Sequence, residues 1–289
     1  MVTTQHKQKI VEAIIAQKDN YASQSKMATA LGVAPAQLSR VLNGEHERVL
    51  SDANFISLAR KLGIELRERM EWNTAHTPVF DFIYNQLTAC QQQSLSALLC
   101  DIADIGKTYT ARIYAKANKN AVYIDCSQVK SKQRLVRKIA QEFGVSHTGK
   151  YIEVYEDLIF YLQTIDKPLV ILDEAGDLEY AAFLELKALW NATEYTCGWY
   201  MMGADGLKAK INRNLGIKKV GYAELFRRFG SRFQKVSPDG KEEFERFRKS
   251  QVAAVAKANG INDIQDMLAK SGGSLQRIYF EIAKTRVNG

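Results

Sequence analysis

The stretch CDIADIGKTYTA, residues 100–111, contains the second half of a phosphate-binding loop. Such a loop follows the pattern G-x-x-x-x-G-K-[ST]. Gly106, Lys107 and Thr108 match its end, whereas Asp101 stands where the first glycine is expected. An apolar stretch precedes the loop and a helical pattern, TYTARIYAKAN, follows it, which is the context that the motif requires. The stretch therefore predicts a nucleotide site at the start of a helix.

A second motif, PLVILDEAGD (168–177), is an apolar strand that ends in two carboxylates, Asp173 and Glu174. In the predicted site, helix N–H groups and Lys107 bind the phosphates of a nucleoside triphosphate, ATP. Thr108 and Asp173 hold Mg²⁺, and Glu174 polarises the attacking water. The alternative is a solvated strand end that merely begins a helix. The predicted nucleotide-binding residues are Asp104, Ile105, Gly106, Lys107, Thr108 and Tyr109.

Short apolar runs alternate with helical stretches from about residue 79. Strands this apolar are buried on both faces, which is typical of a parallel sheet covered by helices. After Pro238 the pattern is helical to the end. We therefore predict an α/β nucleotide-binding domain over residues 79–238 and a helical lid over 239–289. The five predicted strands lie in SLSALLC (94–100), AVYIDC (121–126), PLVILDE (168–174), CGWYMMG (197–203) and RFQKVS (232–237).

Residues 1–70 are largely helical in pattern and form a predicted helix-turn-helix domain, because SQSKMATALGVAPAQLSRVLNG (23–44) has the pattern of that motif. Gly32 permits the turn and Pro35 opens the second helix. On that helix Gln37 and Arg40 are predicted to face DNA. The alternative is an ordinary helical hairpin. Apolar periodicity then fades before Pro78, which predicts a linker over residues 71–78.

Composition and charge narrow the class of protein. With 46% hydrophobic and 25% charged residues, the chain has the composition of a globular protein. No apolar run reaches the roughly 18 residues of a membrane span, and the N-terminal MVTTQHKQK lacks the apolar core of a signal peptide. We expect a cytoplasmic protein without a membrane partner. The four cysteines lack C-x-x-C spacing, so neither a disulfide nor a zinc site is expected.

A net charge of +8 favours an anionic partner, and two basic segments concentrate that charge. SQVKSKQRLVRK (127–138) and GLKAKINRNLGIKKVG (206–221) contain no acidic residue. Such segments suit sequence-tolerant, salt-sensitive contacts with DNA phosphates. The alternative is a pair of solvated helix faces. Their basic residues are Lys130, Lys132, Arg134, Arg137 and Lys138, and Lys208, Lys210, Arg213, Lys218 and Lys219.

Through DIADIGKT and VILDEAGDL, residues 79–289 resemble the AAA+ ATPases. They are most similar to the DNA-transposition branch, which includes the B protein of Mu-like phages and the IstB and TnsC proteins; the helix-turn-helix in front matches the domain order of the phage protein. The resemblance implies a P-loop NTPase with a parallel five-stranded sheet. It also implies a filament or ring of identical subunits whose bore is lined by basic residues that follow the second and fourth strands.

The resemblance implies further site residues. Asp205, after the strand GWYMMG, is the candidate for the polar sensor 1 residue. Arg227, Arg228 and Arg232 in AELFRRFGSRF are candidates for an arginine finger that completes a neighbouring subunit's site. In GGSLQRI, Gln276 stands where the sensor 2 arginine usually lies, and Arg277 comes one position late.

Asp101 and Asp104 both occupy positions that are commonly glycine in this family. Aspartate tolerates left-handed backbone better than most residues, so the loop shape is expected to survive. Two carboxylates near a triphosphate would repel it. We therefore expect ATP binding to be weak and hydrolysis to be slow.

The leading hypothesis is an ATP-dependent AAA+ ATPase that assembles on duplex DNA and delivers target DNA to a transposase. One alternative is a helicase-loader-like ATPase that prefers single strands. Another is a helix-turn-helix transcription regulator with a degenerate nucleotide-sensing domain. Binding to random duplex DNA distinguishes the three.

Overall fold

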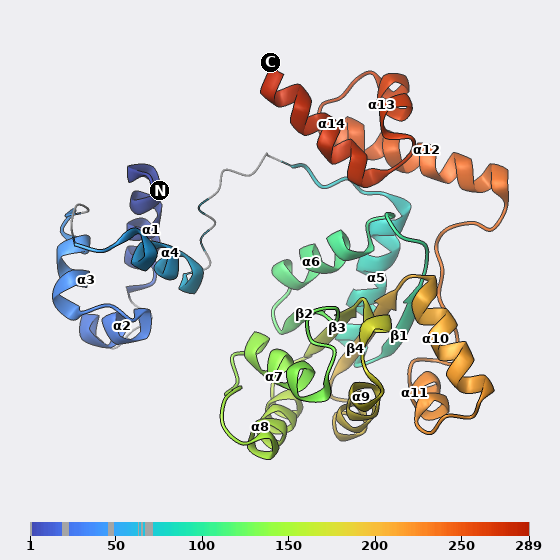
Figure 1. The fold of residues 1–289 in the computed structure, drawn as a ribbon, viewed down its shortest axis with the longest axis horizontal. Helices are drawn as coiled ribbons and strands as arrows, with labels where there is room; N and C mark the ends of the chain where they lie inside the picture. Colours follow the sequence, from blue (N-terminus) through green and yellow to red (C-terminus); the bar gives the residue numbers. More distant parts are fainter. Residues whose placement is uncertain are drawn as a thin grey trace. The chain divides into compact units, whose positions relative to one another are not determined.

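Four helices make up the described part of the first of two units in the computed structural model (Figure 1). The structure describes residues 2–18, 23–45, 49–62, 64, 66 and 72–288. The units are Met1–Glu71 and Trp72–Gly289. Residue 71, the first residue of the predicted linker, lies outside the described residues. The helices of the first unit are α1 (Thr4–Ala16), α2 (Gln24–Leu31), α3 (Pro35–Leu42) and α4 (Asp52–Lys61).

Helices α2 and α3 are joined by a tight turn at residues 32–34. Gly32 has a φ of +70°, which a residue without a side chain adopts at no steric cost. The Lys61 ammonium donates to the Leu31 carbonyl over 2.7 Å and so satisfies the end of α2. Leu38 and Val41 of α3 are buried in the core that the helices of this unit share. The turn and the buried face of α3 therefore fix the geometry of the helix-turn-helix.

The second unit is a sheet covered by helices and followed by a helical lid (Figure 1). Its strands are β1 (Ser96–Cys100), β2 (Ala121–Asp125), β3 (Leu169–Asp173) and β4 (Gly198–Gly203). The helices around them are α5 (Pro78–Gln93), α6 (Lys107–Ala117), α7 (Lys132–Glu142), α8 (Tyr151–Thr164), η2 (a 3-10 turn, Ala175–Asp177), α9 (Tyr180–Ala192), α10 (Asp205–Gly216) and α11 (Tyr222–Arg228). The lid consists of α12 (Lys241–Ala258), α13 (Ile264–Ser271) and α14 (Leu275–Asn288).

Within residues 72–288 the sheet has four parallel strands in the order β1-β4-β3-β2. The prediction of a fifth strand over residues 232–237 is wrong. Only Gln234 pairs there, in a single bridge with Leu99. After Lys235, the backbone N–H groups of Val236 and Ser237 donate to the Asp101 carboxylate instead, and Pro238 has no N–H. A side chain therefore takes the donors that a strand would need.

Alternating side chains of each strand enter two separate cores, as both-face burial predicts. Leu98 of β1 faces the core under α7, α8, α9, α10 and α11, whereas Leu99 faces the core under α5 and α6. The four cysteines are buried free thiols. None of the helices in the described part of the chain is both long and apolar enough to cross a bilayer.

Candidate nucleotide and nucleic-acid site

The loop between β1 and α6 turns sharply into the start of α6. Asp104 (φ 60°) and Gly106 (φ 96°) both adopt the left-handed backbone, which aspartate tolerates and glycine adopts freely. No side chain caps the start of α6, where Gly106 is the cap residue. The first N–H groups of this helix are therefore available to an anion, as in other phosphate sites at helix N-termini.

Lys107 is buried beneath this loop. Its ammonium donates to the carbonyl of Asp101 over 2.8 Å and to that of Ile102 over 2.5 Å. Burial lowers the pKa of Lys107, while the carboxylates of Asp101, Asp173 and Glu174 act in the opposite direction. A desolvated ammonium in this position gains strongly from a second set of acceptors, such as phosphate oxygens.

Thr108 and Asp173, from α6 and the end of β3, are in direct contact. The Thr108 hydroxyl donates to Asp173 Oδ2 over 2.6 Å, and the Tyr123 hydroxyl of β2 donates to the same oxygen over 2.8 Å. Burial and Asp173 raise the pKa of Tyr123, so its phenol remains a donor. A hydroxyl and a carboxylate side by side are the oxygen ligands that Mg²⁺ prefers, and they fit the predicted metal site. The contribution of Tyr123 was missed by sequence reasoning, although a tyrosine near the carboxyl end of a buried strand was a visible signal.

Glu174 follows Asp173 at the carboxyl edge of the sheet. Its backbone is left-handed (φ 48°), which is uncommon outside glycine and is often found at functional sites. The side chain is exposed. Desolvation by partial burial and then repulsion from Asp173 raise its pKa, so the group is more basic than an ordinary glutamate. An exposed, more basic carboxylate is suited to accept a proton from water.

The Asp101 carboxylate is bound within the chain. Its side chain is 1% exposed and points toward residues 236–237. Oδ2 accepts from the N–H groups of Val236 (2.7 Å) and Ser237 (2.9 Å), and Oδ1 accepts from the Ser237 hydroxyl and from Ile102 N (2.8 Å). The residue that replaces the first glycine is thus an anchor for the chain between the sheet and the lid.

Asp104, the other replacement, is exposed and contacts the lid. Its Oδ1 accepts from the backbone N–H of Gln276, in the first turn of α14, over 3.0 Å. Arg277 follows and is exposed, so the predicted sensor 2 segment lies next to the loop. Ile105 is 3% exposed and packs in the core under α5 and α6. Tyr109 is partly exposed, and its hydroxyl lies 2.7 Å from that of Thr74.

A cavity of about 220 Å³ lies between the phosphate loop and the lid. It is lined by Ile102, Ala103, Asp104 and Ile105 of the loop, by Phe244, Arg248 and Gln251 of α12, and by Gly273 and Leu275. Gln251 is 2% exposed, and its carbonyl oxygen has no hydrogen-bond partner among the described residues. Buried polar groups normally have a partner, so this amide is available to a ligand. Sequence reasoning missed it, although a glutamine within the apolar face of α12 (Gln251, Val252, Val255 and Ala256 are buried) was a possible signal.

The remaining predicted site residues differ in whether their side chains are exposed or bound within the subunit. Asp205 is exposed at the start of α10, after β4. Arg228 binds within its own subunit: its Nε donates to Asn191 over 2.6 Å, and its guanidinium lies over the ring of Trp190. Arg227 and Arg232 are exposed. Of the arginine-finger candidates, these two are therefore free to reach a neighbouring subunit.

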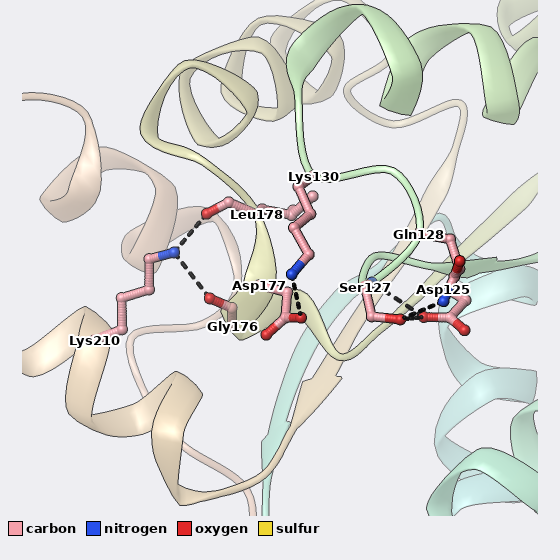
Figure 2. Close-up of polar contacts among 8 residues, drawn as sticks. All are labelled: Asp125, Ser127, Gln128, Lys130, Gly176, Asp177, Leu178 and Lys210. Carbon is pink, nitrogen blue, oxygen red and sulfur yellow. Dashed lines mark hydrogen bonds and ion pairs between the residues drawn. The ribbon is translucent and has the colours of Figure 1, made fainter.

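The two basic segments meet at the turn that follows Glu174. Figure 2 shows Lys130 and Lys210 on either side of residues 176–178. Lys210 donates to the carbonyls of Gly176 (2.8 Å) and Leu178, and burial lowers its pKa. Lys130 forms an ion pair with Asp177 at 3.3 Å. Two of the three ammonium donors of Lys210, a predicted DNA contact, are therefore used within the chain.

Other members of the basic segments remain accessible. Lys132 and Arg134 are exposed in the first turn of α7, and the Lys132 ammonium lies over the Tyr151 ring. Lys208 and Arg213 are exposed on α10. These four cations follow the carboxyl ends of β2 and β4, which lie at the same edge of the parallel sheet as the nucleotide site.

In the helix-turn-helix, the predicted base-reading residues have partners in their own unit. The Gln37 side chain accepts from Ala34 N over 3.3 Å and donates to the Val49 carbonyl over 3.0 Å. Arg40 forms an exposed ion pair with Glu45 at 2.7 Å. The Gln37 side chain thus caps the start of α3, whereas Arg40 is held only by an ion pair that solvent screens.

Comparison with known proteins agrees with this architecture. Residues 90–211 match the model of the AAA domain, and residues 23–69 match that of the helix-turn-helix. The chain therefore contains an AAA domain with a helix-turn-helix domain in front.

Two known proteins are similar to this chain over most of its length. It is 24% identical over 268 residues to the Mu-like prophage FluMu DNA transposition protein B of Haemophilus influenzae, with 89% of each chain covered. It is also similar to the structure of the Aeropyrum pernix Orc1 protein in complex with DNA, with 17% identity and a TM-score of 0.49. That match covers 76% of this chain and 63% of the Orc1 chain, so this chain spans less than two thirds of the length of that structure.

Proposed function

We propose that this AAA protein is an ATPase that assembles on duplex DNA in the presence of ATP and delivers that DNA to a transposase. The observation that carries the proposal is the turn at residues 174–178. Its first residue, Glu174, belongs to the nucleotide site, and its last three are held by Lys130 and Lys210 of the two basic segments. Nucleotide chemistry and DNA contact would therefore act on the same short piece of chain.

The nucleotide site would bind ATP through residues already in contact. Lys107 and the free N–H groups of α6 would bind the phosphates, and the cavity lined by Gln251 and Phe244 would hold the nucleoside. Thr108 and Asp173 would hold Mg²⁺, which when bound neutralises charge on the phosphates. Glu174 would orient and deprotonate the attacking water. Because Asp101 is turned away from the loop, it does not weaken binding in the way its charge suggests.

DNA would contact the exposed cations at the carboxyl edge of the sheet. These are the exposed cations Lys132, Arg134, Lys208 and Arg213. They would bind phosphates rather than base edges, so the contact would tolerate any DNA sequence. The helix-turn-helix would add a second contact, chiefly through Arg40. The delivery step is supported by the relative named DNA transposition protein B, whose match covers 89% of this chain.

The test measures, by fluorescence anisotropy, how tightly the protein binds a random-sequence duplex with and without ATP and Mg²⁺. We expect ATP-dependent binding that weakens steeply with salt and is at least tenfold weaker in the double variant Lys132→Glu/Arg134→Glu. The matched control is Arg246→Glu/Lys249→Glu on the exposed face of α12, which should bind as the unaltered protein does. Tight binding to one palindromic site would instead favour a transcription regulator, and preference for single strands would favour a helicase loader.

A further inference from the structure

The outer face of α8 combines exposed apolar and acidic side chains. Val154, Leu158 and Leu162 bury the opposite face of the helix in the core. On the outer face, Ile152 and Phe160 are 55% and 71% exposed and lie eight residues apart, two helical turns. Glu153, Glu156 and Asp157 are exposed around them. We call these five residues the acidic stripe.

The loop between α10 and α11 has the complementary character. Ile217 and Val220 are 67% and 69% exposed, and Lys218 between them is also exposed. We call residues 217–220 the basic loop.

The basic loop is held in place by contacts with neighbouring helices. Tyr180 donates its hydroxyl to the Val220 carbonyl over 3.0 Å, and the Lys219 ammonium lies 4.2 Å from the centre of the Tyr180 ring. The N–H of Lys219 donates to the Asn214 carbonyl over 2.9 Å. A loop held in this way presents Ile217 and Val220 to solvent at little further entropic cost to a partner.

The acidic stripe and the basic loop lie at opposite flanks of the second unit. Helix α8 packs on α7, which adjoins the β2 edge of the sheet, whereas α10 packs against β1 and β4 (Figure 1). They cannot meet within one chain. Matching surfaces on opposite flanks are what a head-to-tail contact requires, and such a contact repeats into a ring or an open filament.

We propose that the acidic stripe of one copy of this chain packs against the basic loop of the next. Each surface combines two exposed apolar side chains with charged ones, and the two surfaces carry opposite charge. Apolar burial and charge complementarity therefore favour the same pairing. DNA is the poorer occupant of the basic loop, because Ile217 and Val220 would gain nothing from phosphates. The inference deepens the assembly step of the proposed function and rests on it.

The experiment measures the mass of the full-length protein by light scattering across a concentration series, with and without ATP and Mg²⁺. The stripe variant is Ile152→Ser/Phe160→Ser and the loop variant is Ile217→Ser/Val220→Ser. The unaltered protein should grow in mass with concentration, and each variant should self-associate at least tenfold more weakly. An equal mixture of the two variants should reach the mass of two chains and no more, because it contains one intact pair of surfaces. Raising the salt concentration should weaken the unaltered assembly.

Tyr195→Ser, a change at a side chain that is 84% exposed and belongs to neither surface, is the matched control and should assemble as the unaltered protein does. Circular dichroism and ATP binding of each variant establish that it is folded. The proposal is overturned if either variant assembles normally, if the mixture is no heavier than its components, or if the unaltered protein stays monomeric. It is also overturned if the loop variant assembles normally but loses duplex binding. Failure of ATP or DNA binding in the unaltered protein would instead reject the proposed function.

Discussion

The phosphate loop and the helix-turn-helix differ in where their predicted functional side chains are directed. At the loop, Thr108 and Asp173 come from elements 65 residues apart and meet at 2.6 Å. In the helix-turn-helix, Gln37 and Arg40 are bound to groups of their own unit. Side chains that follow the carboxyl ends of neighbouring parallel strands are brought together by the sheet. Side chains on a single helix instead form hydrogen bonds and ion pairs with groups close by in the chain.

The largest expected effect is at Lys107. Lys107→Ala should weaken ATP binding by roughly 100-fold or more, since it removes both the positive charge that faces the phosphates and the one ammonium donor left for them, a charge-assisted hydrogen bond worth about 1.5–3 kcal/mol. Isothermal calorimetry measures this, with Lys116→Ala, an exposed lysine at the far end of the same helix, as control. Equal affinity in the two variants would reject the phosphate-loop assignment.

Glu174→Gln should keep ATP binding and lower the turnover rate by roughly 100-fold or more, the usual contribution of a general base. The conservative change preserves size and removes only the proton acceptor. Phosphate release is measured beside Glu179→Gln, an exposed carboxylate five residues away that should be neutral. Unchanged turnover in Glu174→Gln would remove Glu174 from the chemistry.

The two aspartates of the loop offer a direct contrast. Asp101→Gly restores the usual loop residue yet should lower the free energy of unfolding by roughly 3 kcal/mol, because buried donors at residues 236–237 lose their acceptor. Asp104→Gly, at an exposed residue with positive φ, should leave stability nearly unchanged. Urea denaturation measures both. Tighter ATP binding without loss of stability in Asp101→Gly would show that its charge, and not its hydrogen bonds, matters.

Smaller effects are expected in the helix-turn-helix. Gln37→Ala should destabilise the first unit by about 1 kcal/mol through loss of its capping contacts, with little direct effect on DNA. Arg40→Ala should leave stability within about 0.5 kcal/mol and weaken duplex binding by roughly fivefold, because its exposed ion pair contributes little. Thermal unfolding measures the stability of each variant, and fluorescence anisotropy measures its affinity for duplex DNA. The reverse pattern would identify Gln37 as the base-reading residue.

The smallest effect is a pH dependence at Glu174. A carboxyl group whose pKa is raised by folding costs stability as pH rises through that pKa, because the folded state disfavours its charge. In the absence of nucleotide, Glu174→Gln should therefore melt at a higher temperature than the unaltered protein at pH 7. The difference should vanish as pH falls below the ordinary glutamate value, where both side chains are neutral. A lower melting temperature at pH 7 would contradict the raised pKa.

Much of the nucleotide site could be predicted from the sequence, because its parts are short-range patterns. The glycine and lysine of the loop, the apolar strand that ends at Asp173, and the turn at Gly32 each depend on residues adjacent in the chain. Parallel strands then bring their carboxyl ends to one edge, so Thr108 and Asp173 could be placed together in advance.

Other features were decided only by the tertiary structure. From the sequence, Asp101 was a departure from the glycine of the phosphate-loop motif, but its hydrogen-bond partners lie about 135 residues away in the chain. The same contact ended a strand that apolar patterning had predicted. Lys210 looked like a surface charge until packing placed it beside two carbonyls of the turn at 176–178. Local patterns determine which elements form and which face is buried. Which distant groups satisfy a buried charge or backbone donor depends on packing, because such partners carry no periodic signal in the chain.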